Sequence, residues 1–205
     1  MRKKLSEMSL EELWQLFPII LKDYNPAYPQ WYLEEKEAIM KAVGPDTVCR
    51  INHIGSTAVP GLVSKPTIDI LVEVDRHCDL KTLQDQLLRA GWTLMAYQDP
   101  PDFKMSFNKG YTPDGFAERV FHLHLRFQGD WDELYFRDYL LAHPDIAKAY
   151  GELKLQLQPH YKHNRDGYTQ AKTEFISQWT KKARDEFKDR YRLFKPGQQD
   201  TGSNS

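Results

Sequence analysis

A glycine–serine pair follows the apolar run at residues 51–54 and precedes a second β-branched run at residues 67–74. At the end of a strand, Gly55 and Ser56 present free backbone N–H groups and a hydroxyl, which are groups that bind a phosphate. Asp69, between apolar neighbours in the second run, can hold a divalent cation, because Mg²⁺ prefers one or two carboxylates together with phosphate oxygens. The pattern predicts a nucleotide or phosphate site. The alternative is an ordinary turn that ends a strand and caps a helix.

Two histidines alternate with apolar residues in the run FHLHL. His122 and His124 therefore face the same side of a strand, where imidazoles can chelate a metal or transfer protons. The alternative is a half-exposed sheet face with two satisfied histidines. Arg119 can bind a phosphate or pair with Asp69, although the period of two places it on the opposite face from His122. Lys65 lies in a predicted loop, where it reaches a phosphate as a point charge or lies in solvent.

The elements that must position these residues follow from hydrophobic periodicity and turn signals. Strands are predicted at residues 47–54, 67–74, 92–97, 103–108 and 117–127. Helices are predicted at residues 9–22 with a kink or break at Pro18, and at 29–43, 79–90, 130–141, 144–161 and 168–187. This order places helices before, within and after a small mixed sheet, which is an α+β architecture.

The composition limits the compartment and the partners. Among 205 residues, 28 are basic and 29 acidic, so no overall positive field attracts nucleic acid and any anion site must be local. Cys49 and Cys78 lack metal or redox spacing, which predicts reduced thiols. No run approaches the ~20 apolar residues that span a bilayer. We expect a cytoplasmic protein with no membrane partner and no general nucleic-acid binding.

The segment HIGSTAVPGLVSKPTIDILVEV resembles the GrpB-like family, which is assigned to the nucleotidyltransferase superfamily. The resemblance continues through FHLHL, FRDYLLAHPDIAKAYGELK and YTQAKTEFI, and covers roughly residues 23–180. It implies a mixed sheet of nucleotidyltransferase-like type with N-terminal helices and a C-terminal helical region. The expected divisions are an N-terminal helix at 1–22, a GrpB-like nucleotidyltransferase-fold domain at 23–190 and a polar, disordered tail at 191–205.

The resemblance also implies roles for single residues. In the nucleotidyltransferase core a Gly-Ser element binds the nucleoside triphosphate, and a Dx[DE] pair on the next strand holds Mg²⁺ ions. Gly55 and Ser56 match the first element, and Asp69 matches one carboxylate. Lys154 and Lys172 match the family's pattern in the helical third. These two lysines can close a basic wall over a triphosphate, or lie exposed on their helices.

The carboxylate pair is incomplete, because Leu71 stands where the second acid is expected. Glu73 lies four residues beyond Asp69, about 13 Å along a strand, which is too far to share a metal. A one-metal site of Asp69, His122 and His124 is therefore the expectation, with Mg²⁺ or Mn²⁺ as the cofactor.

The leading hypothesis is a metal-dependent nucleotidyltransferase that binds a nucleoside triphosphate and transfers a nucleotidyl group to an unknown acceptor. In it, Asp69 holds the metal, and His122 and His124 complete the metal shell or deprotonate the acceptor. Two rivals stay open. One is a nucleotide- or metabolite-binding module without turnover, which the missing second acid favours. The other is a metal-dependent hydrolase that uses the HxH pair.

Overall fold

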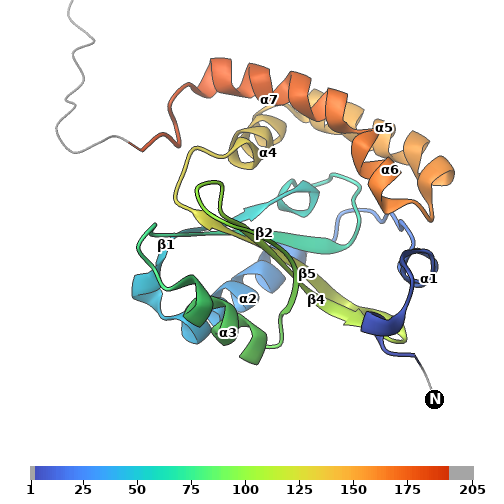
Figure 1. Ribbon diagram of the computed structural model, residues 1–205. Helices are drawn as coiled ribbons and strands as arrows, with labels where there is room; N and C mark the ends of the chain where they lie inside the picture. Colours follow the sequence, from blue (N-terminus) through green and yellow to red (C-terminus); the bar gives the residue numbers. More distant parts are fainter. Residues whose placement is uncertain (1–2, 194–205) are drawn as a thin grey trace, which may run out of the picture.

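Five strands form one mixed sheet in the computed structural model of the protein, which describes residues 3–193 (Figure 1). The strand order is β1-β2-β5-β4-β3, with β2 and β5 parallel and the other neighbours antiparallel. The bounds are β1 Val48–Ile54, β2 Thr67–Val74, β3 Thr93–Gln98, β4 Lys104–Thr112 and β5 Gly115–Phe127. The predicted α+β class is confirmed, and each predicted strand is present.

Helices cover both faces of the sheet (Figure 1). One face carries α2 Tyr28–Val43 and α3 Leu80–Arg89, whose apolar residues join the largest buried core. The other carries α4 Asp132–Ala142, α5 Pro144–Tyr161, α6 Arg165–Gln170 and α7 Thr173–Phe187. Short elements complete the order: η1 Leu5–Glu7, α1 Leu10–Leu16, η2 Pro45–Thr47 and η3 Ser56–Ala58. No helix within residues 3–193 combines the length and the apolar character needed to cross a membrane.

Strands β2 and β5 send alternate side chains to the two layers. Ile68, Ile70 and Leu123 are fully buried in the core beneath α2 and α3. Asp69 and His122 are direct partners in the parallel register, so both point to the opposite face, toward the C-terminal helices. The period of two that the sequence predicts is confirmed for both strands.

The N-terminal helix is shorter than predicted. Ser9 and Glu12 form a capping box at its start, but α1 ends at Leu16 rather than near residue 22. Pro18 explains the end, because its ring removes a backbone N–H and clashes with the preceding turn. Residues 17–27 then run across the domain without helix or strand as a segment that we call the strap.

The C-terminal region also departs from the prediction. The single helix expected at 168–187 is two helices, α6 and α7, separated at Ala171 and Lys172. Tyr191, predicted to lie in the disordered tail, is ordered: its hydroxyl donates to Asp138 at 2.5 Å and accepts from Arg137 at 2.9 Å. The rest of the predicted tail, from residue 194 onward, lies outside the described residues.

Candidate functional site

The Gly-Ser turn sits directly against Asp69. Ile54 and Asp69 are paired across β1 and β2, and Gly55 follows with a φ of +71°. A Cβ built on Gly55 would lie 2.5 Å from Oδ2 of Asp69. Position 55 therefore needs glycine for two reasons, a left-handed backbone and close approach to a carboxylate.

Asp69 is the meeting point of both predicted histidines. Nδ1 of His122 lies 3.1 Å from Oδ1 of Asp69, and Nε2 of His124 lies 3.8 Å from the same oxygen. Burial alone would raise the pKa of Asp69, but the hydrogen bond from His122 and the nearby ring of His124 outweigh it and hold the pKa far below its ordinary value. Asp69 is therefore an ionised carboxylate.

His122 is oriented from its other nitrogen by two residues. The Tyr111 hydroxyl lies 2.8 Å from Nε2, and Nη2 of Arg165 lies 3.3 Å from it. Arg165 has only donors, so Nε2 is an acceptor and the proton of a neutral ring sits on Nδ1, facing Asp69. Burial lowers the pKa of His122, and the neighbouring carboxylate opposes this only in part.

Three lysines surround a small cavity beside this carboxylate. The cavity has a volume of about 160 Å³, and we call it the lysine cavity. Its lining is Gly55, Ser56, Thr57, Ser64, Lys65, Thr67, Asp69, His122, Tyr150, Lys154, Tyr168 and Lys172. The structure thus brings together seven of the nine predicted site residues, from the turn, β2, β5 and the C-terminal helices.

The lysines are held where their charge is costly. Nζ of Lys154 donates to Oγ of Ser56 at 3.0 Å and also to the Val63 carbonyl. Burial, together with the nearby charges of Lys172 and Lys65, lowers the pKa of Lys154 to about 7. Burial likewise lowers the pKa of Lys65 and of Lys172 to about 8, with Arg165 contributing in both cases. The site is therefore rich in positive charge that nearby carboxylates do not balance.

Two of these ammonium groups lie over tyrosine rings. Nζ of Lys154 lies 4.6 Å from the ring centre of Tyr150, and Nζ of Lys172 lies 4.4 Å from that of Tyr168. Tyr168 is 1% exposed, and its buried hydroxyl has no hydrogen-bond partner among the described residues. An unpaired buried hydroxyl costs free energy, and Tyr168 is one of the residues that line the lysine cavity.

Arg119 lies outside the site. Its guanidinium donates to Glu34 at 2.5 Å and covers the Trp31 ring at 5.2 Å. The suggested pairing of Arg119 with Asp69 is wrong. The alternation along β5 places Arg119 on the face opposite to His122, and Asp69 on β2 lies on the same face as His122. Glu73 is separate as well: it is fully buried and accepts hydrogen bonds from Arg50, at 2.7 Å to Nη2, and from the Gly129 N–H at 3.0 Å.

Sequence reasoning missed Arg165 and Tyr111. Arg165 opens a short helix and carries no motif. Tyr111 could have been found by aligning the hairpin formed by β4 and β5, which pairs Asn108 with His122 and then shifts register between residues 109 and 111. That shift, rather than composition, brings the Tyr111 hydroxyl to His122.

The donor set is poor in acids for a metal centre. Asp69 is its sole carboxylate, both histidines direct a ring nitrogen at one of its oxygens, and three lysines and Arg165 stand nearby. Within residues 3–193, no group of three His, Cys, Asp or Glu side chains is arranged to hold a metal ion. The residues present do not fit the two-metal arrangement of a nucleotidyltransferase, which needs several anionic oxygens.

The chain is similar in sequence and in structure to known proteins. It is 34% identical over 181 residues to protein YqkA of Bacillus subtilis (strain 168), covering 84% of this chain and 50% of that protein. The chain thus spans about half the length of that relative. The crystal structure of the conserved protein GrpB from Enterococcus faecalis is similar with a TM-score of 0.71 at 31% identity, over 82% of this chain and 99% of that one.

A weaker likeness, with a TM-score of 0.47 at 12% identity, relates 68% of this chain to 44% of the Cid1 poly(U) polymerase. Residues 18–182 match the family described as GrpB protein. This range contains every residue that lines the lysine cavity. This chain belongs to the GrpB family.

Proposed function

We propose that the lysine cavity binds the phosphate group of a nucleotide or a related phosphorylated metabolite. The observation that carries the proposal is Tyr168, which lines a cavity together with three lysines and whose buried hydroxyl has no hydrogen-bond partner among the described residues. A phosphate oxygen would accept hydrogen bonds from this hydroxyl and from the ammonium groups. The Gly55–Ser56 turn lines the same cavity and supports the assignment.

The charges support an anion rather than a neutral ligand. Lys65, Lys154 and Lys172 titrate near neutral pH because burial disfavours their charged forms. A bound phosphate supplies the missing negative charge and restores the ordinary preference for protonated lysine. Asp69 already has His122 and His124 as partners, so it leaves the lysines available to the ligand.

The size of the cavity indicates which part of a ligand it holds. Pockets that enclose a whole small molecule measure roughly 300–1,000 Å³. The lysine cavity, at about 160 Å³, is large enough for a phosphate group but not for an entire nucleotide. The remainder of the ligand must extend outside it.

Replacing Tyr168 with phenylalanine tests the proposal with a minimal change. Titration calorimetry with inorganic phosphate and with ATP should give affinities roughly 5- to 30-fold weaker for Tyr168→Phe, since a hydrogen bond to a charged group is worth about 1.5–3 kcal/mol and water recovers part of it. Without ligand, the variant should be as stable as the natural protein or slightly more so. The matched control is Tyr97→Phe, at a half-exposed tyrosine on β3, which should change neither quantity. Unchanged phosphate binding in Tyr168→Phe would contradict the proposal.

Nucleotidyl transfer with Mg²⁺ or Mn²⁺ is the second candidate, and it rests on the convergence of His122 and His124 on one oxygen of Asp69. The variant Asp69→Asn separates the two. If the cavity binds phosphate without a metal, removing a negative charge next to the lysines should tighten ATP binding in the presence of a chelator. If a metal at Asp69 bridges to the phosphates, the variant should lose metal-dependent binding, and the natural protein should release pyrophosphate from ATP.

A further inference from the structure

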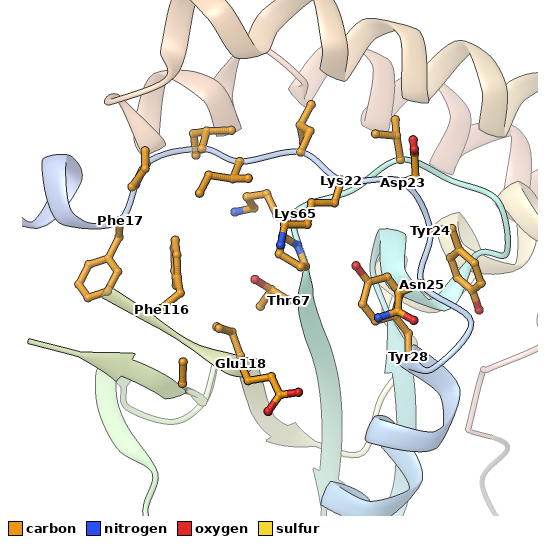
Figure 2. Close-up of a pocket in the computed structure, with 18 of the residues that line it drawn as sticks. Phe17, Lys22, Asp23, Tyr24, Asn25, Tyr28, Lys65, Thr67, Phe116 and Glu118 are labelled. Carbon is orange, nitrogen blue, oxygen red and sulfur yellow. The ribbon is translucent and has the colours of Figure 1, made fainter. Parts of the chain in front are cut away.

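A large cleft adjoins the lysine cavity beneath the strap. Its volume is about 930 Å³, and it shares Lys65 and Thr67 with the smaller cavity. Arg165, which contacts His122, lines the cleft as well. Figure 2 shows the strap along one side, with Lys65 and Thr67 between its two ends. The two hollows are therefore neighbouring parts of one surface.

Aromatic rings gather at both ends of the cleft (Figure 2). At one end, Phe17 packs against Tyr111 and Phe116, with ring centres 4.8 and 5.0 Å apart. At the other end, Tyr24 and Tyr28 meet edge to face at 5.5 Å. Because Tyr28 is 1% exposed, Tyr24 supplies the accessible ring at this end. Aromatic rings pair favourably in offset or edge-to-face geometry, so accessible rings at the two ends of the cleft suit a ligand that carries a planar ring.

Exposed apolar side chains concentrate along the same cleft. Ile20 is 39% exposed, Phe116 37% and Leu155 53%, and all three line it. Apolar side chains gathered on a single concave surface indicate a binding site more strongly than the same residues scattered singly.

The strap is held in place by backbone hydrogen bonds. Lys22 and Ser64 exchange two of them, at 2.8 and 2.9 Å, and the Ile19 N–H donates to the Lys162 carbonyl at 2.7 Å. Gln158 donates to the Ile19 carbonyl at 2.9 Å. The wall of the cleft is thus formed before any ligand arrives, which reduces the ordering cost of binding.

We infer that the cleft beneath the strap binds the ring-bearing body of an organic phosphate whose phosphate group occupies the lysine cavity. The inference rests on the proposed function, because it takes the phosphate position from it. It adds a second subsite and a ligand class, namely a phosphate ester with an aromatic or heteroaromatic group. Lys65 and Thr67, common to both hollows, lie at the junction of the two parts of the ligand.

Two ligands that differ only in the body test the inference on the natural protein: inorganic phosphate and 1-naphthyl phosphate. Calorimetry should show the naphthyl ester binding at least about tenfold more tightly, because an aromatic group buries on the order of 150 Å² of surface. Ile20→Ser and Phe116→Ser should remove most of that advantage and leave the affinity for inorganic phosphate unchanged. Met95→Ser is the control, since Met95 is an exposed apolar residue on β3 that does not line the cleft.

The outcomes separate the two proposals. If inorganic phosphate binds but the naphthyl ester binds no more tightly, the phosphate site stands and the cleft assignment is overturned. The cleft assignment also fails if Ile20→Ser and Phe116→Ser leave the naphthyl advantage intact. If neither ligand binds the natural protein, the proposed function itself is overturned and the cleft assignment with it.

Discussion

Replacing Lys154 with methionine is expected to change how the stability of the protein depends on pH. Lys154 is 3% exposed, and its pKa of about 7 in the folded protein compares with an ordinary value of 10.5. Between these values the unfolded chain binds the proton and the folded protein does not, so the free energy of unfolding rises with pH. Below pH 7 the folded protein bears the full cost of a buried charge, which is at most about 5 kcal/mol for a pKa difference of this size.

Methionine keeps an unbranched chain of similar length and removes the titrating group. The free energy of unfolding of Lys154→Met, relative to the natural protein, should therefore be highest near pH 6 and lower by about 2–3 kcal/mol near pH 9, because about two pH units of the titration lie between 7 and 9. The lost hydrogen bonds to Ser56 and Val63 subtract an amount that is nearly the same at both pH values. The decisive quantity is how much the stability difference between Lys154→Met and the natural protein changes from pH 6 to pH 9, rather than the sign of that difference at either pH.

Urea unfolding in phosphate-free buffers at about pH 6, 7.5 and 9 measures this change by linear extrapolation. Lys148→Met is the matched control, because Lys148 lies on the same helix α5 and its side chain is 80% exposed. A difference between Lys154→Met and the natural protein that stays constant from pH 6 to 9 would refute the account of Lys154 as a buried, easily deprotonated lysine. A pH-dependent difference of equal size in Lys148→Met would refute it too.

Two further predictions follow from the same site. Gly55→Ala should lower the free energy of unfolding by about 3 kcal/mol, because the new Cβ meets the Asp69 carboxylate at 2.5 Å in a backbone conformation with φ +71°. Gly61→Ala, at φ +77° with no atom within 4 Å of its Cβ, should cost only about 1 kcal/mol, and equal losses in chemical denaturation would contradict the close-approach argument. Sulfate, whose charge is constant in this range, should bind at least about tenfold more weakly at pH 9 than at pH 6.5, because the lysines of the lysine cavity lose their protons near pH 7 to 8. Affinity for sulfate that does not fall on titration to pH 9 would count against anion binding by these lysines.

Local sequence signals predict most of the sheet. The strand predicted from Thr67 to Val74 has the same bounds as β2, because β-branched residues between a proline and a charged turn favour a strand over a helix. Pro18 and Gly44 likewise predict where the first two helices, α1 and α2, end. The break between α6 and α7 carries no proline or glycine at Ala171 and Lys172, so periodicity alone continues the helix across it.

The candidate site is predictable only in part, for a physical reason. Within one strand, the alternation of side chains fixes the face of the sheet to which each residue points. Asp69, His122 and His124 therefore lie on the face that the sequence predicts. Arg165 and Tyr111 reach His122 through helix placement and a register shift in a hairpin, which depend on contacts distant in sequence. Arg119 shows that residue type alone misleads. An arginine suits phosphate binding, but its place in the strand turns it away from the site, toward Glu34 and Trp31.

The paired backbone hydrogen bonds between Lys22 and Ser64 have a consequence for how the strap and the lysine cavity are coupled. Ser64 lines the lysine cavity and precedes Lys65, so the strap is hydrogen-bonded directly to a backbone segment that forms the cavity wall. A ligand that fixes Lys65 must then slow the local opening that exposes the amides of Lys22 and Ser64 to hydrogen exchange. By reciprocity, opening of the strap must weaken ligand binding by the same free energy by which the bound ligand disfavours that opening. The N-terminal segment is in this sense an energetic part of the site, although it contributes no residue to the lining of the lysine cavity.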